Sequence, residues 1–134
     1  MSAITSTDNV MHTNTVQLAA CDIARLRQLC EELDADSVRE LAEEFLRELP
    51  ERLREIQTLS IAGPTPEFRR SAHSLKGSSA SMGFDALAAY CGELEHAADV
   101  GDAGSIQTLV PGLDRIARNA TSAMRAWMDS VPSA

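Results

Sequence analysis

The sequence predicts an all-α fold: an antiparallel up-down-up-down four-helix bundle with an additional short N-terminal helix. Hydrophobic residues make up 44% of the 134 residues but aromatic residues only 4%, so the core has to be built from aliphatic side chains, a composition that favours helices over sheets. Apolar residues recur at steps of three and four along most of the chain, and no run alternates apolar and polar residues as a half-buried strand does. The breaks between these patterns are short, which makes consecutive helices antiparallel neighbours.

The N-terminal part divides into a tail and a first helix. Residues 1–15 are rich in Ser, Thr and Asn and show no sustained period, so we expect a flexible polar tail followed by one domain over residues 16–130. Asp22 is a candidate N-cap for a short helix. The apolar side of that helix consists of Ile23, Leu26, Leu29, Cys30 and Leu33.

A long amphipathic helix follows, with Asp36 or Ser37 as its expected N-cap. Its predicted core positions step by three and four: Val38, Leu41, Phe45, Leu49, Leu53, Ile56 and Leu59. Pro50 falls inside this pattern and has no N–H to donate to the carbonyl of Leu46, so we expect a kink there.

Three further helices complete the predicted bundle. Thr65 and Pro66 indicate the N-cap and first residue of the third helix, which runs to about Met82 and ends at Gly83. The fourth starts near Phe84 or Asp85, and its inward positions are Leu87, Cys91, Leu94 and Ala98. The fifth has an apolar side made of Ile106, Leu109, Leu113, Ile116, Ala120, Met124 and Trp127, within which Pro111 is expected to kink or split the helix.

Composition and charge exclude several classes of function. A net charge of −8 argues against a general nucleic-acid binder or a protein of anionic membrane surfaces. No apolar run approaches the roughly 18 residues of a membrane span, and the N-terminus lacks the basic and apolar segments of a secretory signal. Cys21, Cys30 and Cys91 contain no C-x-x-C pair, and we interpret them as small apolar side chains in a reducing compartment. We therefore expect a cytoplasmic protein without nucleic-acid or membrane partners.

The third predicted helix carries a histidine away from its core face. The core positions of this helix are Phe68, Ala72, Leu75, Ser79 and Met82. His73 lies about 100° from Ala72 on the helical wheel and so belongs to a different stripe. That stripe contains cations but no acid, and its residues become small towards the C-terminal end: Arg69, Arg70, His73, Lys76, Gly77 and Ala80.

Gly77 is an unfavourable choice for the helix itself, because glycine in a helix interior costs roughly 1 kcal/mol relative to alanine. A glycine four residues after His73 removes a side chain that would crowd the ring, and this lets another surface approach. An uncrowded histidine among cations suits an anionic visitor, such as a phosphate or an acidic pocket. The alternative is a solvated face with an incidental histidine, and spacing alone does not decide between the two.

The fourth predicted helix offers a partner for His73. In an antiparallel hairpin, His73 faces roughly residues 93–95, where Glu95 is the acid that borders the inward face. Glu95 can accept a hydrogen bond from the Nδ1–H of His73, which would orient the ring and leave Nε2 as an outward lone pair. The alternative is that Glu95 is an ordinary boundary charge, paired with Lys76 or Arg70.

The segment AHSLKGSSASMGFDALAAYCGELEHAA, residues 72–98, resembles a histidine-containing phosphotransfer (HPt) domain, and the resemblance extends over about residues 18–128. The family pattern has a phospho-accepting His, a Lys at +3 and Gly at +4 and +10; it is met by His73, Lys76, Gly77 and Gly83. Family members often carry a Gln or Glu at +22 that bonds the imidazole, and here that position is Glu95.

The resemblance implies that His73 accepts a phosphoryl group from a receiver-domain aspartate and passes it to another receiver domain. Glu95 would orient the imidazole and Lys76 would offset the phosphate charge. The docking face would include Arg69, Arg70, Gly77 and Ala80. The receivers, in a hybrid sensor kinase or a response regulator, would bring Mg²⁺, so no cofactor is expected on this chain. We expect a monomeric phosphohistidine carrier without ATP-dependent kinase activity, since no nucleotide-binding loop or domain fits in this length.

Other functions have weaker support in the sequence. The main alternative is a non-relay helical docking module that binds a signalling partner while His73 stays unphosphorylated. The histidines and cysteines have no recognised ligand spacing, so no metal site is predicted. A hydrolase is disfavoured because no Ser-His-acid or paired-carboxylate arrangement is visible.

Overall fold

The computed structural model describes residues 19–131, and it is helical throughout its regular structure. Its helices are α2 (Ile23–Glu32), α3 (Ala35–Leu59), α4 (Pro66–Ser81), α5 (Asp85–Asp99), α6 (Ala103–Leu109) and α7 (Leu113–Ser130), with 3₁₀ turns η1 (Ser60–Ala62) and η2 (Val110–Gly112). The predicted fold class is confirmed. The predicted tail, residues 1–15, and the predicted domain start at residue 16 lie outside the described residues.

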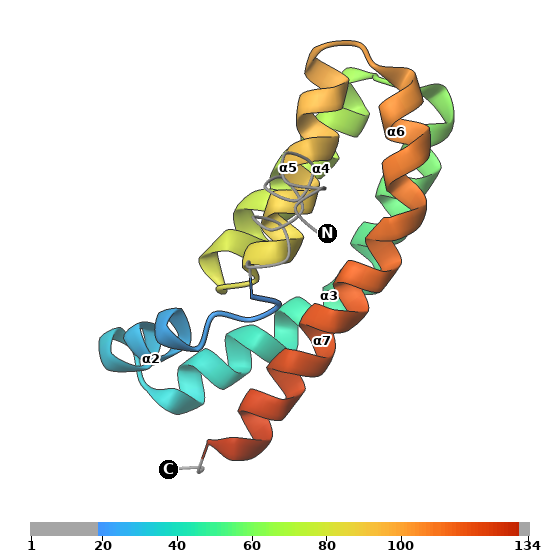
Figure 1. The fold of residues 1–134 in the computed structure, drawn as a ribbon. Coiled ribbons are helices and arrows are strands. Elements are labelled where there is room, and N and C mark those ends of the chain that lie inside the picture. The colour runs from blue at the N-terminus through green and yellow to red at the C-terminus, as the bar shows by residue number, and fades with distance from the viewer. Residues whose placement is uncertain (1–18, 132–134) are drawn as a thin grey trace, which may run out of the picture.

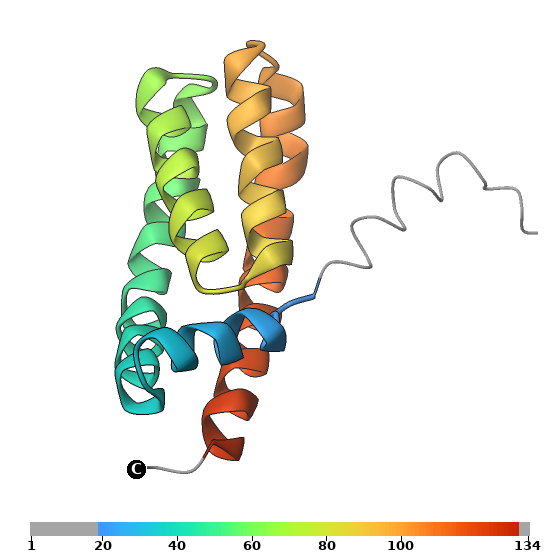
Figure 2. The same cartoon turned by 90° about the vertical axis from the view of Figure 1, so that its left-hand side faces the viewer.

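Four antiparallel columns form the bundle: α3, α4, α5 and the consecutive pair α6 and α7 (Figures 1 and 2). In Figure 2, α4 and α5 make the face towards the viewer, and α3 and α7 lie behind them. The short α2 lies across the end of the bundle at which α4 turns into α5. Within residues 19–131, no helix is both long and apolar enough to cross a membrane.

Local capping chemistry sets most helix starts where the sequence places them. The Asp22 carboxylate accepts a hydrogen bond from the Arg25 backbone N–H at the start of α2. Thr65 does the same for Phe68, with Pro66 as the first residue of α4. The prediction for α3 was wrong, because Asp34 rather than Asp36 or Ser37 is the N-cap.

Asp34 is the better cap because its two carboxylate oxygens bind different groups of one residue. Oδ1 accepts from the Ser37 backbone N–H at 2.7 Å, and Oδ2 accepts from the Ser37 hydroxyl at 3.1 Å. Helix α3 therefore begins with Ala35, and Asp36 falls in its first turn, where a negative charge is favourable.

The core is one hydrophobic cluster between the four columns, mostly aliphatic but with Phe45, Phe68, Phe84 and Trp127. In α3 the buried side steps through Val38, Ala42 and Phe45; Leu41 lies about 100° from Ala42, at the edge of this side, and is 43% exposed. Leu41 is thus not a core position, contrary to the prediction. On the apolar side predicted for the first helix, Ile23 in α2 and its C-cap Leu33 are 40% and 50% exposed. All five predicted core residues of the third helix are buried: Phe68, Ala72, Leu75 and Ser79 in α4, and Met82 at its C-cap.

Two prolines interrupt the helical pattern differently. Helix α3 continues through Pro50 as one uninterrupted helix. Pro111 splits the last predicted helix into α6, η2 and α7. The Tyr90 hydroxyl donates a hydrogen bond of 2.6 Å to the carbonyl of Leu109, the last residue of α6, and so satisfies a carbonyl at this break.

Gly83 forms the corner between α4 and α5. Its φ of +81° is a conformation that residues with a side chain rarely adopt. Its carbonyl accepts a hydrogen bond of 2.7 Å from the Asp22 backbone N–H, which ties the start of α2 to the corner. A Cβ at this position would lie 3.2 Å from the Asp22 carbonyl oxygen, so the close approach of α2 also requires glycine.

Candidate functional site

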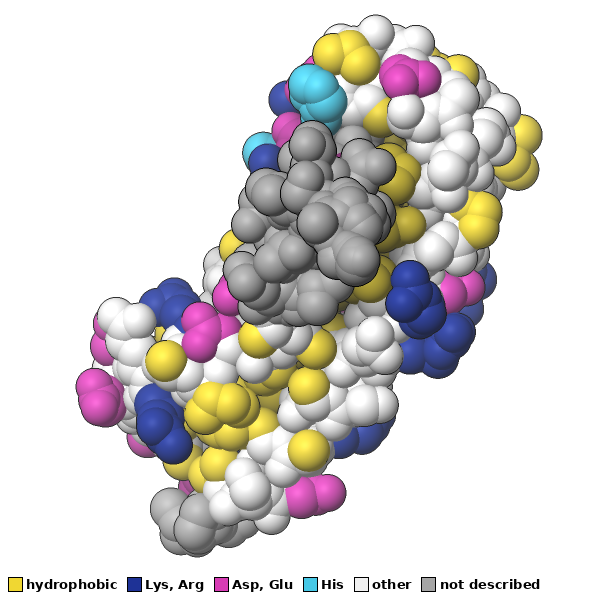
Figure 3. All heavy atoms as spheres, viewed as in Figure 1, with side chains coloured by type: hydrophobic (Ala, Val, Ile, Leu, Met, Phe, Trp, Pro, Cys, Tyr) yellow, Lys and Arg dark blue, Asp and Glu magenta, His cyan; other side chains and the backbone are white. Residues whose placement is uncertain are grey.

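The α4–α5 hairpin carries the candidate site on its solvent side. The stripe of α4 that includes Leu75 is buried, whereas the side chain of His73 is 59% exposed. His73 is therefore not a core histidine, as its helical phase predicts. Figure 3 shows imidazole rings gathered with basic and acidic side chains along this edge of the molecule.

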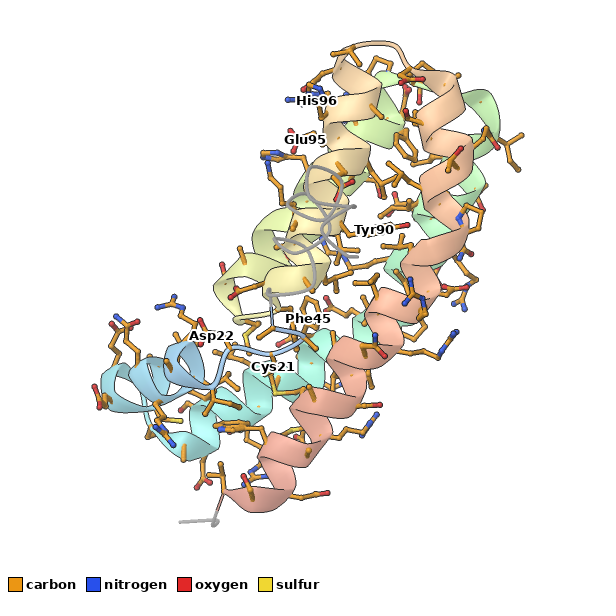
Figure 4. The ribbon with its side chains drawn as sticks, viewed as in Figure 1. Cys21, Asp22, Phe45, Tyr90, Glu95 and His96 are labelled. Atoms are coloured by element: carbon orange, nitrogen blue, oxygen red, sulfur yellow. The ribbon has the colours of Figure 1, made fainter. Side chains whose placement is uncertain are left out.

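A hydrogen bond joins His73 to the neighbouring helix. The Nδ1 atom of His73 lies 2.9 Å from Oε2 of Glu95, as the hairpin register predicts. Glu95 projects from α5, and its side chain is only 9% exposed (Figure 4). An ionised carboxylate can only accept a hydrogen bond, so in the neutral ring Nδ1 carries the proton and Nε2, on the other side of the ring, has the lone pair.

Glu95 is held by cations as well as by the imidazole. The Lys76 ammonium lies 2.7 Å from Oε1, and Nη2 of Arg69 lies 3.1 Å from Oε2. The close contact with the Lys76 ammonium is the largest cause that lowers the pKa of Glu95; burial opposes it, and the hydrogen bond from His73 adds to the lowering. Glu95 therefore stays ionised and remains an acceptor.

The sequence left two interpretations of Glu95 open, and both describe the structure. Glu95 bonds the imidazole and is also an ion-pair partner of Lys76. The expected alternative pairing with Arg70 does not occur among the described residues; Arg69 takes that place.

Asp99 extends the cluster by one turn, and sequence reasoning did not identify it as a site residue. Its Oδ1 accepts a hydrogen bond from Nε of Arg69. The signal in the sequence is spacing: Asp99 is four residues after Glu95, and Arg69 is four residues before His73. Because α4 and α5 are antiparallel, going four residues back from His73 and four residues on from Glu95 moves the same way along the hairpin. Arg69 therefore lies opposite Asp99, one turn beyond the pair of His73 and Glu95.

The other predicted positions lie around the ring or beside it. Gly77 and Ala80 are exposed, and a Cβ at Gly77 would have no neighbour within 4 Å. No packing within the described residues therefore requires glycine at this position. Arg70 is also exposed, but it lines a groove between α3 and α4 together with Arg52 and is not part of the Glu95 cluster.

Gly92 on α5 is a further residue that sequence reasoning did not assign to the site. A Cβ at Gly92 would lie 3.4 Å from Cδ of Lys76, so the stem of this lysine passes close to the backbone of α5. Among residues 19–131, no three His, Cys, Asp or Glu side chains are grouped so that they could hold a metal ion.

Comparison with known proteins gives consistent matches. The family model described as Hpt domain matches residues 40–131. The chain is 34% identical over 93 residues to phosphorelay protein LuxU of Vibrio vulnificus strains YJ016 and CMCP6, a match that covers 69% of this chain and 81% of each relative. Its structure is similar to the crystal structure of histidine-containing phosphotransfer protein B (HptB) from Pseudomonas aeruginosa PAO1, with a TM-score of 0.75 and 28% identity over 84% of this chain and 97% of that one.

Proposed function

Because the chain belongs to the Hpt domain family and is a histidine phosphotransfer protein of a phosphorelay, we propose that His73 is the residue that carries the phosphoryl group. The observation that carries this assignment is the hydrogen bond between Nδ1 of His73 and the buried Glu95. The His73 side chain is nevertheless 59% exposed, so its other ring nitrogen is accessible to a partner. A base whose orientation is fixed by a third group is the general arrangement of an activated nucleophile.

The proposed reaction needs no proton transfer. The Nε2 lone pair attacks the phosphorus of an aspartyl phosphate on a receiver domain, a nitrogen–phosphorus bond forms, and the bond from phosphorus to the aspartate oxygen breaks, leaving a carboxylate. The ring gains positive charge while Nδ1 keeps its proton, and the adjacent Glu95 carboxylate stabilises that charge. Transfer to a second receiver is the same displacement in reverse.

Hpt phosphorelay proteins act with receiver domains, and we propose receivers of a hybrid sensor kinase and of a response regulator as the donor and acceptor. The receiver supplies Mg²⁺, and this chain supplies the nucleophile, so it needs no cofactor of its own. Lys76, close to His73 on α4, offsets the charge of the phosphoryl group. The docking face for the receiver consists of exposed residues near His73: Arg70, Gly77 and Ala80. We propose further that the protein is monomeric and acts in the cytoplasm.

A label-transfer experiment tests the assignment of His73. The protein is incubated with a phosphorylated receiver, and the expected product carries an acid-labile, alkali-stable phosphoryl label. His73→Gln should accept no label, whereas His96→Gln, which changes another exposed histidine on α5, should accept it normally. Label on the His73→Gln protein would refute the assignment, as would absence of label on the wild-type protein with every cognate receiver.

The role of Glu95 has its own test. Glu95→Ala should slow the transfer of the label while the helical content and the unfolding transition stay cooperative, because the exposed ring loses the acceptor that fixes Nδ1–H. Glu95→Gln should retain more activity, since the amide oxygen can still accept that bond. Equal transfer rates in all three proteins would exclude an orienting role for Glu95.

A further inference from the structure

We propose that Arg69 is a positioning residue for phosphotransfer: it acts on His73 through Glu95 and is itself held in place by Asp99. The proposal rests on the function proposed above, because it concerns the orientation of the same imidazole. It assigns Arg69 a role inside the chain, in place of the contact with a partner that its basic character suggests.

The guanidinium of Arg69 joins two carboxylates on successive turns of α5. Its Nε donates to Oδ1 of Asp99, and its Nη2 lies 3.1 Å from Oε2 of Glu95. The planar guanidinium presents N–H groups in a fixed fork, so a contact at one end determines where the other end points. Anchoring by Asp99 thus restricts the position from which Arg69 contacts Glu95.

Arg69 and His73 share one oxygen of the carboxylate. Both contact Oε2, whereas Lys76 contacts Oε1. Without Arg69, the only remaining cation of the pair would be Lys76 on Oε1. The carboxylate could then rotate, which would distort the hydrogen bond between Oε2 and Nδ1 of His73. Arg69 therefore fixes the rotation of the carboxylate about its own axis, and the carboxylate fixes the ring.

Arg69 also frees Lys76 for a second task. A phosphoryl group on Nε2 brings negative charge next to Lys76, which can then leave Oε1 to contact phosphoryl oxygens. Glu95 would lose its nearest cation at this moment and, with its side chain only 9% exposed, needs another. Arg69 remains on Oε2 and keeps Glu95 ionised, and so keeps it an acceptor for Nδ1–H.

A docking role fits Arg70 better than Arg69. Arg69 is 42% exposed and its charge faces two carboxylates of its own chain. Arg70 is exposed and forms no ion pair with any residue in the part of the chain that the structure describes. Two adjacent arginines thus provide a matched comparison, since each can be changed to alanine with the same loss of charge.

Single-turnover transfer from a phosphorylated receiver, measured over a range of receiver concentrations, separates the two roles. Arg69→Ala should lower the maximal rate about fivefold, the size expected for loss of one partly exposed charged hydrogen bond, with little change in the concentration that gives half-maximal rate. Arg70→Ala should raise that concentration and leave the maximal rate nearly unchanged. If Arg69→Ala behaves like Arg70→Ala, Arg69 is a docking cation and the proposal is wrong.

The ring nitrogens of His73 give a readout that docking would not affect. In ¹⁵N spectra of the unphosphorylated wild type, the neutral ring should be almost entirely the Nδ1–H tautomer. Arg69→Ala and Asp99→Asn should both shift it towards a mixture of tautomers, and Arg70→Ala should not. A wild-type tautomer ratio in the Arg69→Ala protein would overturn the proposal.

A double-mutant cycle connects the rate effect to Glu95. A glutamine at this position can accept the Nδ1–H bond but carries no charge, so it needs no cation to hold it. In the Glu95→Gln protein, adding Arg69→Ala should slow transfer less than twofold. If Arg69→Ala lowers the transfer rate fivefold both in the wild type and in the Glu95→Gln protein, Arg69 acts independently of Glu95 and the proposal is wrong. Failure of wild-type His73 to take label would instead refute the proposed function, so the two failures are distinguishable.

Discussion

Replacement of Gly77 by alanine should make the protein more stable and a poorer phosphotransfer partner. Gly77 lies inside α4, is exposed, and has no atom within 4 Å of the position of an added Cβ. The methyl group therefore meets no steric resistance within the described residues. The remaining effect is helix propensity, for which alanine is favoured over glycine by about 0.8–1 kcal/mol.

Thermal unfolding followed by circular dichroism measures the first half of this prediction. A gain of about 1 kcal/mol in the free energy of unfolding corresponds to a rise in Tm of roughly 3–5 °C for a domain of this size. Gly77→Gln adds a longer side chain on the same open surface and should also fold, with a smaller gain because glutamine is a slightly weaker helix former than alanine.

Titration with a receiver measures the second half. Gly77 is one turn from His73, so on the docking face proposed above a side chain here would occupy the space through which a receiver reaches the ring. We expect weaker receiver binding and slower transfer for Gly77→Ala and a much larger loss for Gly77→Gln.

Gly104→Ala is the matched control, because this glycine is exposed on α6, outside α4 and α5, and its added Cβ makes only an ordinary contact of 3.5 Å with Asp102. It should leave transfer unchanged, which separates steric blocking from any effect of added stability. Gly77→Gln protein that is folded and binds and phosphorylates normally would refute the clearance argument.

Three further predictions concern stability. The pKa of Glu95 is lowered in the folded protein, so the stabilisation by this carboxylate is present above the ordinary glutamate pKa and is lost as pH falls through the lowered value. The difference in Tm between the wild type and Glu95→Gln should therefore shrink on acidification. A difference that stays constant with pH would contradict this. Gly83→Ala should cost about 1–2 kcal/mol in denaturant unfolding, since φ is +81° and Asp22 is close. Tyr90→Phe should cost about 1 kcal/mol through the lost bond to Leu109, and an unchanged midpoint would exclude that contribution.

The helices and their buried faces could be predicted because they depend on neighbours within a few residues. Thr65 and Pro66 mark the start of α4 by themselves, and the buried stripe through Leu75 follows from steps of three and four. The error at the start of α3 occurs where two local solutions compete. Asp34 and Asp36 are both plausible caps, and the two hydrogen bonds from Asp34 to Ser37 decide between them.

The candidate site was predictable in part. The bond between His73 and Glu95 follows from counting residues on both sides of the α4–α5 corner, since antiparallel helices pair residues at equal distances from it. The same counting does not reveal that Arg69 contacts Glu95 and Asp99 of α5, because a long side chain can point to solvent or to a neighbour with little difference in spacing.

The sequence by itself determined an all-helical bundle, the exposure of His73 and the presence of a glycine one turn away, because these are properties of phase and propensity along one helix. Only the tertiary structure decided how charge is distributed around the ring. It showed that packing within the described residues does not require Gly77, and that Lys76 and Arg69 hold Glu95 from its two oxygens. Such contacts depend on the rotation and offset of α4 against α5, which are set by the packing of the whole core and not by any one segment.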